Sequence, residues 1–419
     1  MNTLLLSHIG MLATPTGRTA KAGRAQGEIL TLSDAWVYAK DGRITAVGTG
    51  SVPSVLKNAD CTLDCAGKLI TPGLVDAHTH LVFGGWRQNE LAMKLHDVPY
   101  LDILAQGGGI LSTVKATRSA SEDALAEKAA GALDEMLRFG TTTCEAKSGY
   151  GLDLDTELKQ LRVIRRLNQT HPMDLAATFM GAHALPPEYR EKRADYLRFL
   201  CEQVIPAVAD EKLAEFCDVF CETGVFTAGE AEQILQAAKE HGLRAKIHAD
   251  EIDPIGGSQL AGQIGAISCE HLIVCPEAGI ESLAKGGTVA CLLPATSFYL
   301  NTTYAPARRM IQSGVPVALA SDFNPGSCPC LNLQLVMNIA CLKYRMTPEE
   351  VLTGVTLNGA AAIARADRVG SVELGKQADL VIWDAPDLNY LCYRLGSDLA
   401  GTVIKNGQIV KGEADGKNH

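Results

Sequence analysis

The sequence predicts an α/β protein: a (β/α)8 TIM-like barrel joined to a small composite β-sandwich domain formed from both chain ends. Two observations lead to this prediction. Eight short apolar runs alternate with helix-like segments through the middle of the chain, and both ends carry hairpin signals between strand-like runs. We expect the barrel to span residues 71–364 and the composite domain to comprise residues 1–70 and 365–419.

The hairpin signals at the two ends resemble each other. "DAWVYAKDGRITAVG" places Asp41 and Gly42 between two β-prone runs, and Asp-Gly is a strong signal for a tight hairpin turn. Near the other end, "TVIKNGQIV" places Asn406 and Gly407 in the same way, after the strand-like run "ADLVIWD". The pattern favours one β domain assembled from both termini; two unrelated β extensions are the alternative.

Eight apolar runs in the middle of the chain predict the strands of the barrel. Segments such as "SEDALAEKAAGALDEMLRF" and "GEAEQILQAAKEHG" separate them and have the composition and periodicity of helices. Eight repetitions favour a closed parallel barrel over a doubly wound open sheet. The runs are "GLVDAHTHL", "TTTCEAKS", "DLAATFMGAHA", "CDVFCE", "RAKIHADE", "AISCEHL", "TVACLLP" and "VPVALASDF".

Composition narrows the class of protein. The 419 residues are 47% hydrophobic and 21% charged, which is enough to build a large core. A formal net charge of −10 argues against binding to nucleic acid or to an anionic membrane. The sequence has neither a secretory leader pattern nor an apolar run of the ~18 residues that would cross a bilayer. We therefore expect a soluble, cytoplasmic protein.

The thirteen cysteines are scattered, odd in number and mostly placed in apolar runs, which is typical of reduced, buried thiols. Cys328 and Cys330, in "SCPC", are close enough in sequence to suggest a soft-metal clip. Because no second pair accompanies them, loop packing is the favoured interpretation, and we assign them no role.

Polar residues gather where the predicted strands end, which is where active sites of β/α barrels lie. Of ten histidines, five fall at or just past the ends of apolar runs, and an aspartate closes the eighth run. These residues are His78 and His80 after the first run, His183 after the third, His248 after the fifth, His271 after the sixth and Asp322 after the eighth.

His78 and His80 are two residues apart, so on a strand their side chains point to the same face and can bind one metal ion. A His-x-His pair alone is weak support for a metal site, but His248 and Asp322 at other strand ends complete a ligand set. Imidazole and carboxylate ligands suit one zinc or iron ion, divalent or trivalent. A hydrolytic site also keeps a position for water, whose pKa the metal lowers towards ~7.

Glu251 lies three residues after His248, in "HADE". A carboxylate there could take a proton from water and pass it to a leaving nitrogen; a solvated loop charge is the alternative. His271 could be a second proton-transfer group or a further metal ligand.

These residues resemble the pattern of the amidohydrolase superfamily. "PGLVDAHTH", the histidines of the fifth and sixth runs and the aspartate of "ASDFNPG" occur in the superfamily's order, and the resemblance covers essentially the whole chain. No lysine ends the fourth run, where binuclear members carry a bridging carboxylated lysine. Glu222 could bridge two ions in principle, but a single ion held by His78, His80, His248 and Asp322 fits better.

Five segments, "THLVFGGWRQNE", "EAKSGYGL", "FMGAHALP", "HADE" and "SDFNPGS", are similar to one branch of that superfamily. The resemblance implies hydrolytic ring opening of 4-imidazolone-5-propanoate in histidine degradation and a homodimeric assembly. Glu251 and His271 would be catalytic, and Arg87 would bind the propanoate through its guanidinium. The alternatives are another aminohydrolase acting on a small cyclic substrate and a non-catalytic barrel. The implied substrate contacts are Arg87, Tyr150, His183, Glu251, Asn324, Gly326 and Ser327.

Overall fold

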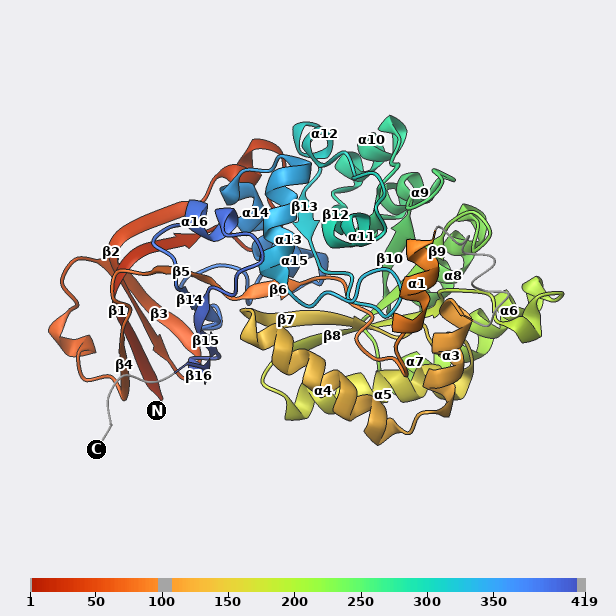
Figure 1. Cartoon of the computed structure of the whole chain (residues 1–419), viewed down its shortest axis with the longest axis horizontal. Helices are drawn as coiled ribbons and strands as arrows, with labels where there is room; N and C mark the ends of the chain where they lie inside the picture. Colours follow the sequence, from red (N-terminus) through yellow and green to blue (C-terminus); the bar gives the residue numbers. More distant parts are fainter. Residues whose placement is uncertain (1, 97–107, 413–419) are drawn as a thin grey trace.

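The computed structural model describes residues 2–96 and 108–412, and it contains two eight-stranded sheets (Figure 1). One sheet is entirely parallel, and its strands follow one another in chain order, as expected for successive β/α units. A parallel bridge between Thr79 and Phe323 connects the segments that follow the first and last strands. The predicted barrel is thereby confirmed. Its strands are β6 (Leu74–Asp76), β7 (Thr141–Lys147), β8 (Asp174–Ala182), β9 (Phe216–Cys221), β10 (Arg244–Ala249), β11 (Ser268–His271), β12 (Val289–Leu292) and β13 (Val317–Leu319).

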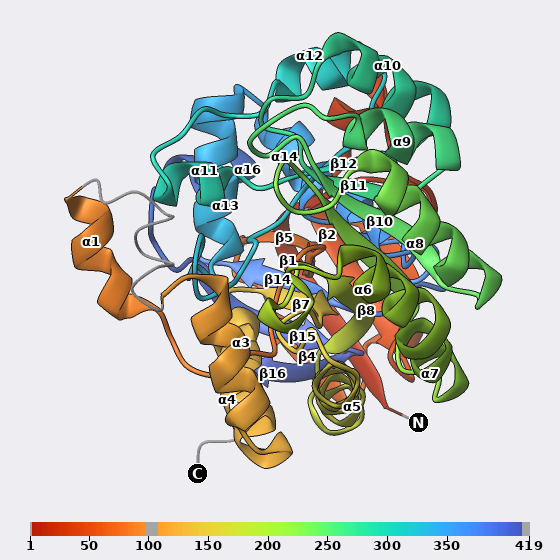
Figure 2. The same ribbon diagram turned by 90° about the vertical axis from the view of Figure 1, so that its right-hand side faces the viewer.

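Helices surround the parallel strands, as Figure 2 shows. Local sequence sets where several begin: Ser121 caps one by accepting a hydrogen bond from the Ala124 N–H, and Thr227 forms a capping box with Glu230. The helices are α1 (Leu91–Leu95), α3 (Ile110–Ser119), α4 (Glu122–Arg138), α5 (Leu154–Thr170), α6 (Arg193–Phe199), α7 (Ile205–Asp210), α8 (Ala228–Glu240), α9 (Gly257–Ile264), α10 (Glu277–Gly286), α11 (Pro294–Tyr299), α12 (Ala307–Gln312), α13 (Leu333–Ile339), α14 (Pro348–Gly354), α15 (Leu357–Ala362) and α16 (Leu388–Tyr393).

The second sheet is mixed and takes strands from both ends of the chain (Figure 1). N-terminal β5 pairs in parallel with β1 and antiparallel with C-terminal β14, so the two ends meet inside one sheet. The composite β domain is therefore confirmed, and the alternative of unrelated extensions is wrong. The strands are β1 (Thr3–Thr14), β2 (Leu30–Lys40), β3 (Arg43–Thr49), β4 (Cys61–Asp64), β5 (Leu69–Pro72), β14 (Leu380–Trp383), β15 (Ala400–Lys405) and β16 (Gln408–Lys411).

Both predicted hairpin turns are present. Asp41 and Gly42 have φ of 50° and 78°, and Asn406 and Gly407 have φ of 49° and 71°. Positive φ at both central residues is the geometry that Asp-Gly and Asn-Gly favour. The turns connect β2 to β3 and β15 to β16. The domain boundaries at residues 70 and 364 stay predictions. Within the part of the chain that the structure describes, no helix combines the length and apolar character needed to cross a membrane.

Candidate metal and catalytic site

The four predicted metal ligands converge at the carboxyl ends of the barrel strands. His78 and His80 follow β6, His248 lies near the end of β10, and Asp322 follows β13. Nε2 of His78 and Nε2 of His80 lie 3.3 and 3.7 Å from Oδ1 of Asp322. Potential ligand atoms of His78, His80 and Asp322 lie within 4.8 Å of one another, and so do those of His78, His248 and His271.

Four histidines at this site each have one buried ring nitrogen that makes no hydrogen bond to the described residues. Nε2 of His78, Nδ1 of His80, Nε2 of His248 and Nδ1 of His271 have no hydrogen-bond partner among the described residues. An unpaired polar atom in the interior is costly, and a metal ion that accepts the nitrogen lone pair would remove that cost. The residues present therefore fit a bound metal ion.

Burial also sets the charge state that metal binding needs. It lowers the pKa of His78, His80 and His248 well below the usual range of histidine, so the imidazoles are neutral. Neutral imidazole is the form that coordinates a metal. Burial raises the pKa of Asp322 to about 7, because the ionised carboxylate is not hydrated by solvent in the interior. A cation beside Asp322 would compensate for that loss.

Carboxylates fix the ring orientation of two of these histidines. Oε2 of Glu270 lies 2.8 Å from Nδ1 of His78, and Oδ1 of Asp218 lies 3.0 Å from Nδ1 of His248. Each contact leaves Nε2 directed to the site, the arrangement usual for metal-binding histidines. Neither role is among those predicted from the sequence. The available signal was a charged residue inside an otherwise apolar strand, as in "FCDVFC".

Glu251 and His271 lie side by side next to the ligand cluster. Nε2 of His271 is 3.6 Å from Oε2 of Glu251. Burial, with the nearby Glu222 carboxylate, raises the pKa of Glu251 to about 7. Glu222 itself accepts hydrogen bonds from the backbone N–H groups of residues 251–253, at 2.9–3.1 Å. It therefore shapes the loop that carries Glu251.

Backbone strain occurs at two of the candidate residues. His271 has φ of 68° and Asp322 has φ of 57°, in the left-handed region that non-glycine residues seldom adopt. Oδ2 of Asp322 accepts a hydrogen bond of 2.7 Å from the Thr296 hydroxyl. Such strain is common where surrounding structure holds a functional side chain in place.

Arg87 lies in the segment after the first barrel strand and is held from two sides. Glu90 accepts hydrogen bonds from its Nε and Nη2, both at 2.9 Å, and also from the Gly109 N–H. A Cβ built on Gly326 would lie 2.2 Å from Nη1 of Arg87, so a larger residue there would displace the guanidinium. The structure thus brings the predicted residues Arg87 and Gly326 into contact.

Tyr150 and His183 form an aromatic wall beside His80. The His183 ring stacks on His80 with 4.9 Å between centroids, and Tyr150 lies 5.2 Å from His183. Nδ1 of His183 contacts the Gly149 carbonyl oxygen at 3.0 Å, and burial lowers the pKa of His183 to about 4. A neutral His183 can present its other nitrogen to a ligand.

Asn324 organises its own loop. Its amide group donates to the Asp322 carbonyl and to the Ser327 hydroxyl, while its oxygen accepts from the N–H groups of Gly326 and Ser327. These four hydrogen bonds connect the loop to the candidate ligand Asp322. The predicted contacts Asn324 and Ser327 are therefore adjacent to the site and engaged with each other.

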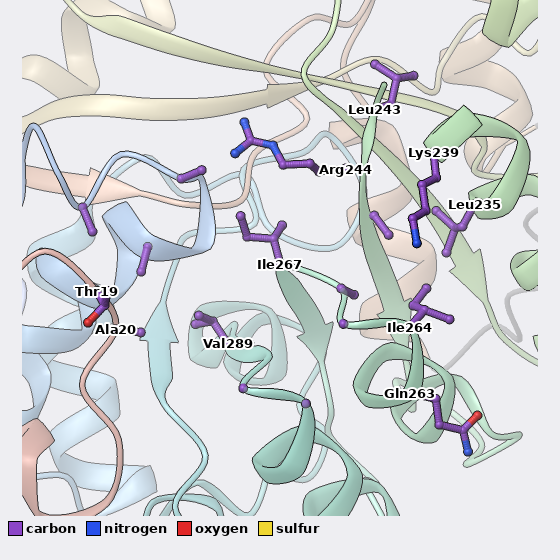
Figure 3. A pocket seen from close by; sticks show the side chains of 18 of the residues that line it. Thr19, Ala20, Leu235, Lys239, Leu243, Arg244, Gln263, Ile264, Ile267 and Val289 are labelled. Carbon is purple, nitrogen blue, oxygen red and sulfur yellow. The ribbon is translucent and has the colours of Figure 1, made fainter. Parts of the chain in front are cut away.

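A cavity of about 830 Å³ lies at the opposite end of the barrel (Figure 3). Arg244 and Val289, the first residues of β10 and β12, line it, whereas His248 and His271 lie at or near the far ends of β10 and β11. It takes no part in the candidate site.

Comparisons with known proteins agree with this geometry. The model of the Amidohydrolase family matches residues 69–417. Imidazolonepropionase of Alkaliphilus metalliredigens is 51% identical over 414 residues, which is 98% of each chain. Imidazolonepropionase of Bacillus cytotoxicus is 51% identical over 417 residues, covering 99% of this chain and 98% of the relative.

Solved structures of deaminases share the fold. An adenosine deaminase from Xanthomonas campestris with bound zinc has a TM-score of 0.74 at 20% identity, covering 99% of this chain and 94% of that one. E. coli guanine deaminase has a TM-score of 0.72 at 16% identity, covering 99% and 100%. At such identities the likeness concerns the fold alone. The chain belongs to the amidohydrolase family and, within it, to the family of its imidazolonepropionase relatives.

Proposed function

We propose that this chain hydrolyses 4-imidazolone-5-propanoate to N-formimidoyl-L-glutamate, a ring-opening step of histidine degradation. The observation that carries the proposal is the cluster of buried, unpartnered imidazole nitrogens around Asp322, with Glu251 and His271 beside it. Imidazolonepropionase relatives at 51% identity over nearly the whole chain support the choice of substrate.

His78, His80, His248 and Asp322 would hold one metal ion, zinc or iron. When bound, the ion would supply Lewis acidity and lower the pKa of water. Glu251 accepts a proton from the water that attacks the ring carbonyl carbon, and it delivers that proton to the ring nitrogen. The carbon–nitrogen bond of the ring breaks, a new carboxylate forms, and the nitrogen leaves within the formimidoyl group.

The remaining residues bind and orient the substrate. Arg87 receives the propanoate carboxylate, to which a guanidinium offers paired N–H donors. His271 donates a hydrogen bond to the carbonyl oxygen as negative charge develops on it. His183, whose Nδ1–H donates to the Gly149 carbonyl oxygen, presents Nε2 as an acceptor for an N–H group of the substrate. Tyr150 covers the ring, and the loop of Asn324, Gly326 and Ser327 closes the polar side of the site.

The test follows the absorbance of freshly prepared 4-imidazolone-5-propanoate with and without a chelator. We expect loss of absorbance that the chelator abolishes. Cytosine and guanine serve as competing substrates, because a deaminase acting on neutral bases would not need Arg87. Hydrolysis of either base without turnover of the imidazolone would refute the proposal.

The setting of the reaction is part of the same proposal. We assign the enzyme to the cytoplasm and expect a homodimer with one metal ion per chain. Sedimentation of the purified protein and metal analysis per chain would test the last two points.

A further inference from the structure

A chain of buried charges runs inside the barrel beneath the candidate metal ligands. It comprises three carboxylates and two lysines, a formal charge of −1, and every member is fully buried. They lie on four strands of the barrel, and the proposed mechanism gives three of them no role. The members are Glu145 and Lys147 on β7, Asp218 on β9, Lys246 on β10 and Glu270 on β11.

One half of the chain begins at His248. Its Nδ1 lies 3.0 Å from Oδ1 of Asp218, whose Oδ2 accepts a hydrogen bond of 2.8 Å from Nζ of Lys147. The same Nζ donates to Oε1 of Glu145 at 2.6 Å. Burial opposes the charge on Lys147, but the carboxylates of Asp218 and Glu145 raise its pKa above the usual range, so it stays charged.

The other half leads from Glu145 to His78. Nζ of Lys246 lies 3.4 Å from Oε1 of Glu145 and 3.4 Å from Oε1 of Glu270. Oε2 of Glu270 completes the path at 2.8 Å from Nδ1 of His78. Two candidate ligands from different strands are thus connected through five charged groups, with Glu145 in the middle.

A contribution to folding stability does not explain why the barrel buries these five charged side chains. Barrel interiors are usually filled by branched apolar side chains, and an apolar core of equal volume is often as stable as buried ion pairs. The carboxylates are also fully engaged: Thr178 donates to Glu145, and Ser268 donates to Glu270. Two ends of this network contact imidazoles whose Nε2 atoms point to the metal site.

We propose that Glu145, together with Lys147 and Lys246, positions the two carboxylates that contact the candidate ligands and so sets the affinity for the metal ion. Asp218 is held against His248, and Glu270 is held against His78. The inference rests on the proposed metal site. Glu145 shares both lysines with the outer carboxylates. Without it, each lysine pairs more tightly with Asp218 or Glu270 and weakens that carboxylate's hold on its histidine.

The experiment measures the zinc affinity of the metal-stripped full chain by competition with a chromophoric chelator, and the visible spectrum of the cobalt form. We expect Glu145→Gln to weaken zinc binding about 10- to 100-fold, as partners behind metal-binding histidines generally do. The cobalt spectrum should change, because the ligand geometry changes. Unaltered zinc affinity and cobalt spectrum in the folded variant would overturn the inference.

A matched control separates positioning from stability. Asp379 is also a buried carboxylate paired with a buried lysine, Lys405 at 2.6 Å, but it lies in the mixed-sheet domain. Asp379→Asn should lower thermal stability and leave zinc affinity unchanged; a loss of affinity equal to that of Glu145→Gln would mean that general destabilisation explains both.

A second variant covers the case in which Glu145→Gln does not fold. Glu145→Gln combined with Lys246→Met removes one charge of each sign, so the interior keeps its formal charge. This variant should fold and still lose zinc affinity at least 10-fold; wild-type affinity would refute the inference. Turnover of 4-imidazolone-5-propanoate by the wild-type chain is a separate measurement, so the proposed function can fail while the affinity pattern holds.

Discussion

The two eight-stranded sheets bury very different side chains. The mixed sheet packs an apolar cluster that includes Leu6, Ile9 and Ile404, all fully buried. Its buried Asp379 is satisfied by Lys405 and by the Asn406 N–H. The barrel instead buries a chain of charges and four histidines that each have one ring nitrogen without a hydrogen-bond partner among the described residues. The mixed sheet therefore uses its interior for stability, whereas the barrel mouth holds buried polar groups that lower stability but can bind a metal ion and move protons.

Of the changes that test this difference between the two sheets, removal of the metal ion should have the largest effect on turnover. Exhaustive chelation is expected to abolish turnover, because without the ion nothing in the site lowers the pKa of the attacking water. It should also lower the melting temperature, since a ligand present at about 100 times its Kd stabilises the folded state by about 2.7 kcal/mol. Activity and calorimetry of chelated and zinc-restored protein measure both. If metal analysis finds no bound ion and the protein is still fully active, the barrel site does not depend on a metal ion.

Glu251→Gln should reduce kcat by about 10²- to 10⁴-fold, the usual contribution of a general acid–base group. The amide cannot accept the proton from water, but it leaves the metal ligands in place. Steady-state kinetics and metal content per chain are the measurements. Asp253→Asn, an exposed carboxylate on the same loop, is the control and should be nearly silent. A variant that kept most of its activity would contradict the role of Glu251.

Arg87→Lys should raise KM for the imidazolone by about 10- to 100-fold with a smaller change in kcat. The ammonium keeps the charge but loses the planar fork, and hydrogen bonds to charged groups contribute about 1.5–3 kcal/mol. Arg309→Lys is the matched control, because Arg309 makes a similar two-point contact with Glu277 on the surface. Equal effects of the two substitutions would show that the change at Arg87 is not specific to substrate.

A substitution in the mixed sheet should have the smallest effect and a different kind of effect. Asn406→Ala places an alanine at φ of 49°, which costs about 1–2 kcal/mol of stability. Denaturant unfolding should show that loss, while kcat and KM stay at wild-type values. A large drop in kcat would mean that the two sheets are functionally coupled and that the mixed sheet does more than stabilise the fold.

Local sequence determined much of this protein. The eight apolar runs became eight strands because short apolar segments between helices have few other ways to bury themselves. Asp41-Gly42 and Asn406-Gly407 became hairpin turns because these pairs adopt positive φ at low cost. His78, His80, His248 and Asp322 were predicted from their position at strand ends, which a parallel barrel brings to one face.

Tertiary structure decided the rest, because the deciding partners lie far apart in sequence. The pairing of β5 with β14 joins residues about 310 positions apart, and no local pattern encodes it. The contacts of Asp218 with His248 and of Glu270 with His78 span 30 and 192 positions. Sequence could place charged residues in buried strands, but which charges meet, and which imidazole nitrogens remain without partners, depends on strand register across the closed barrel.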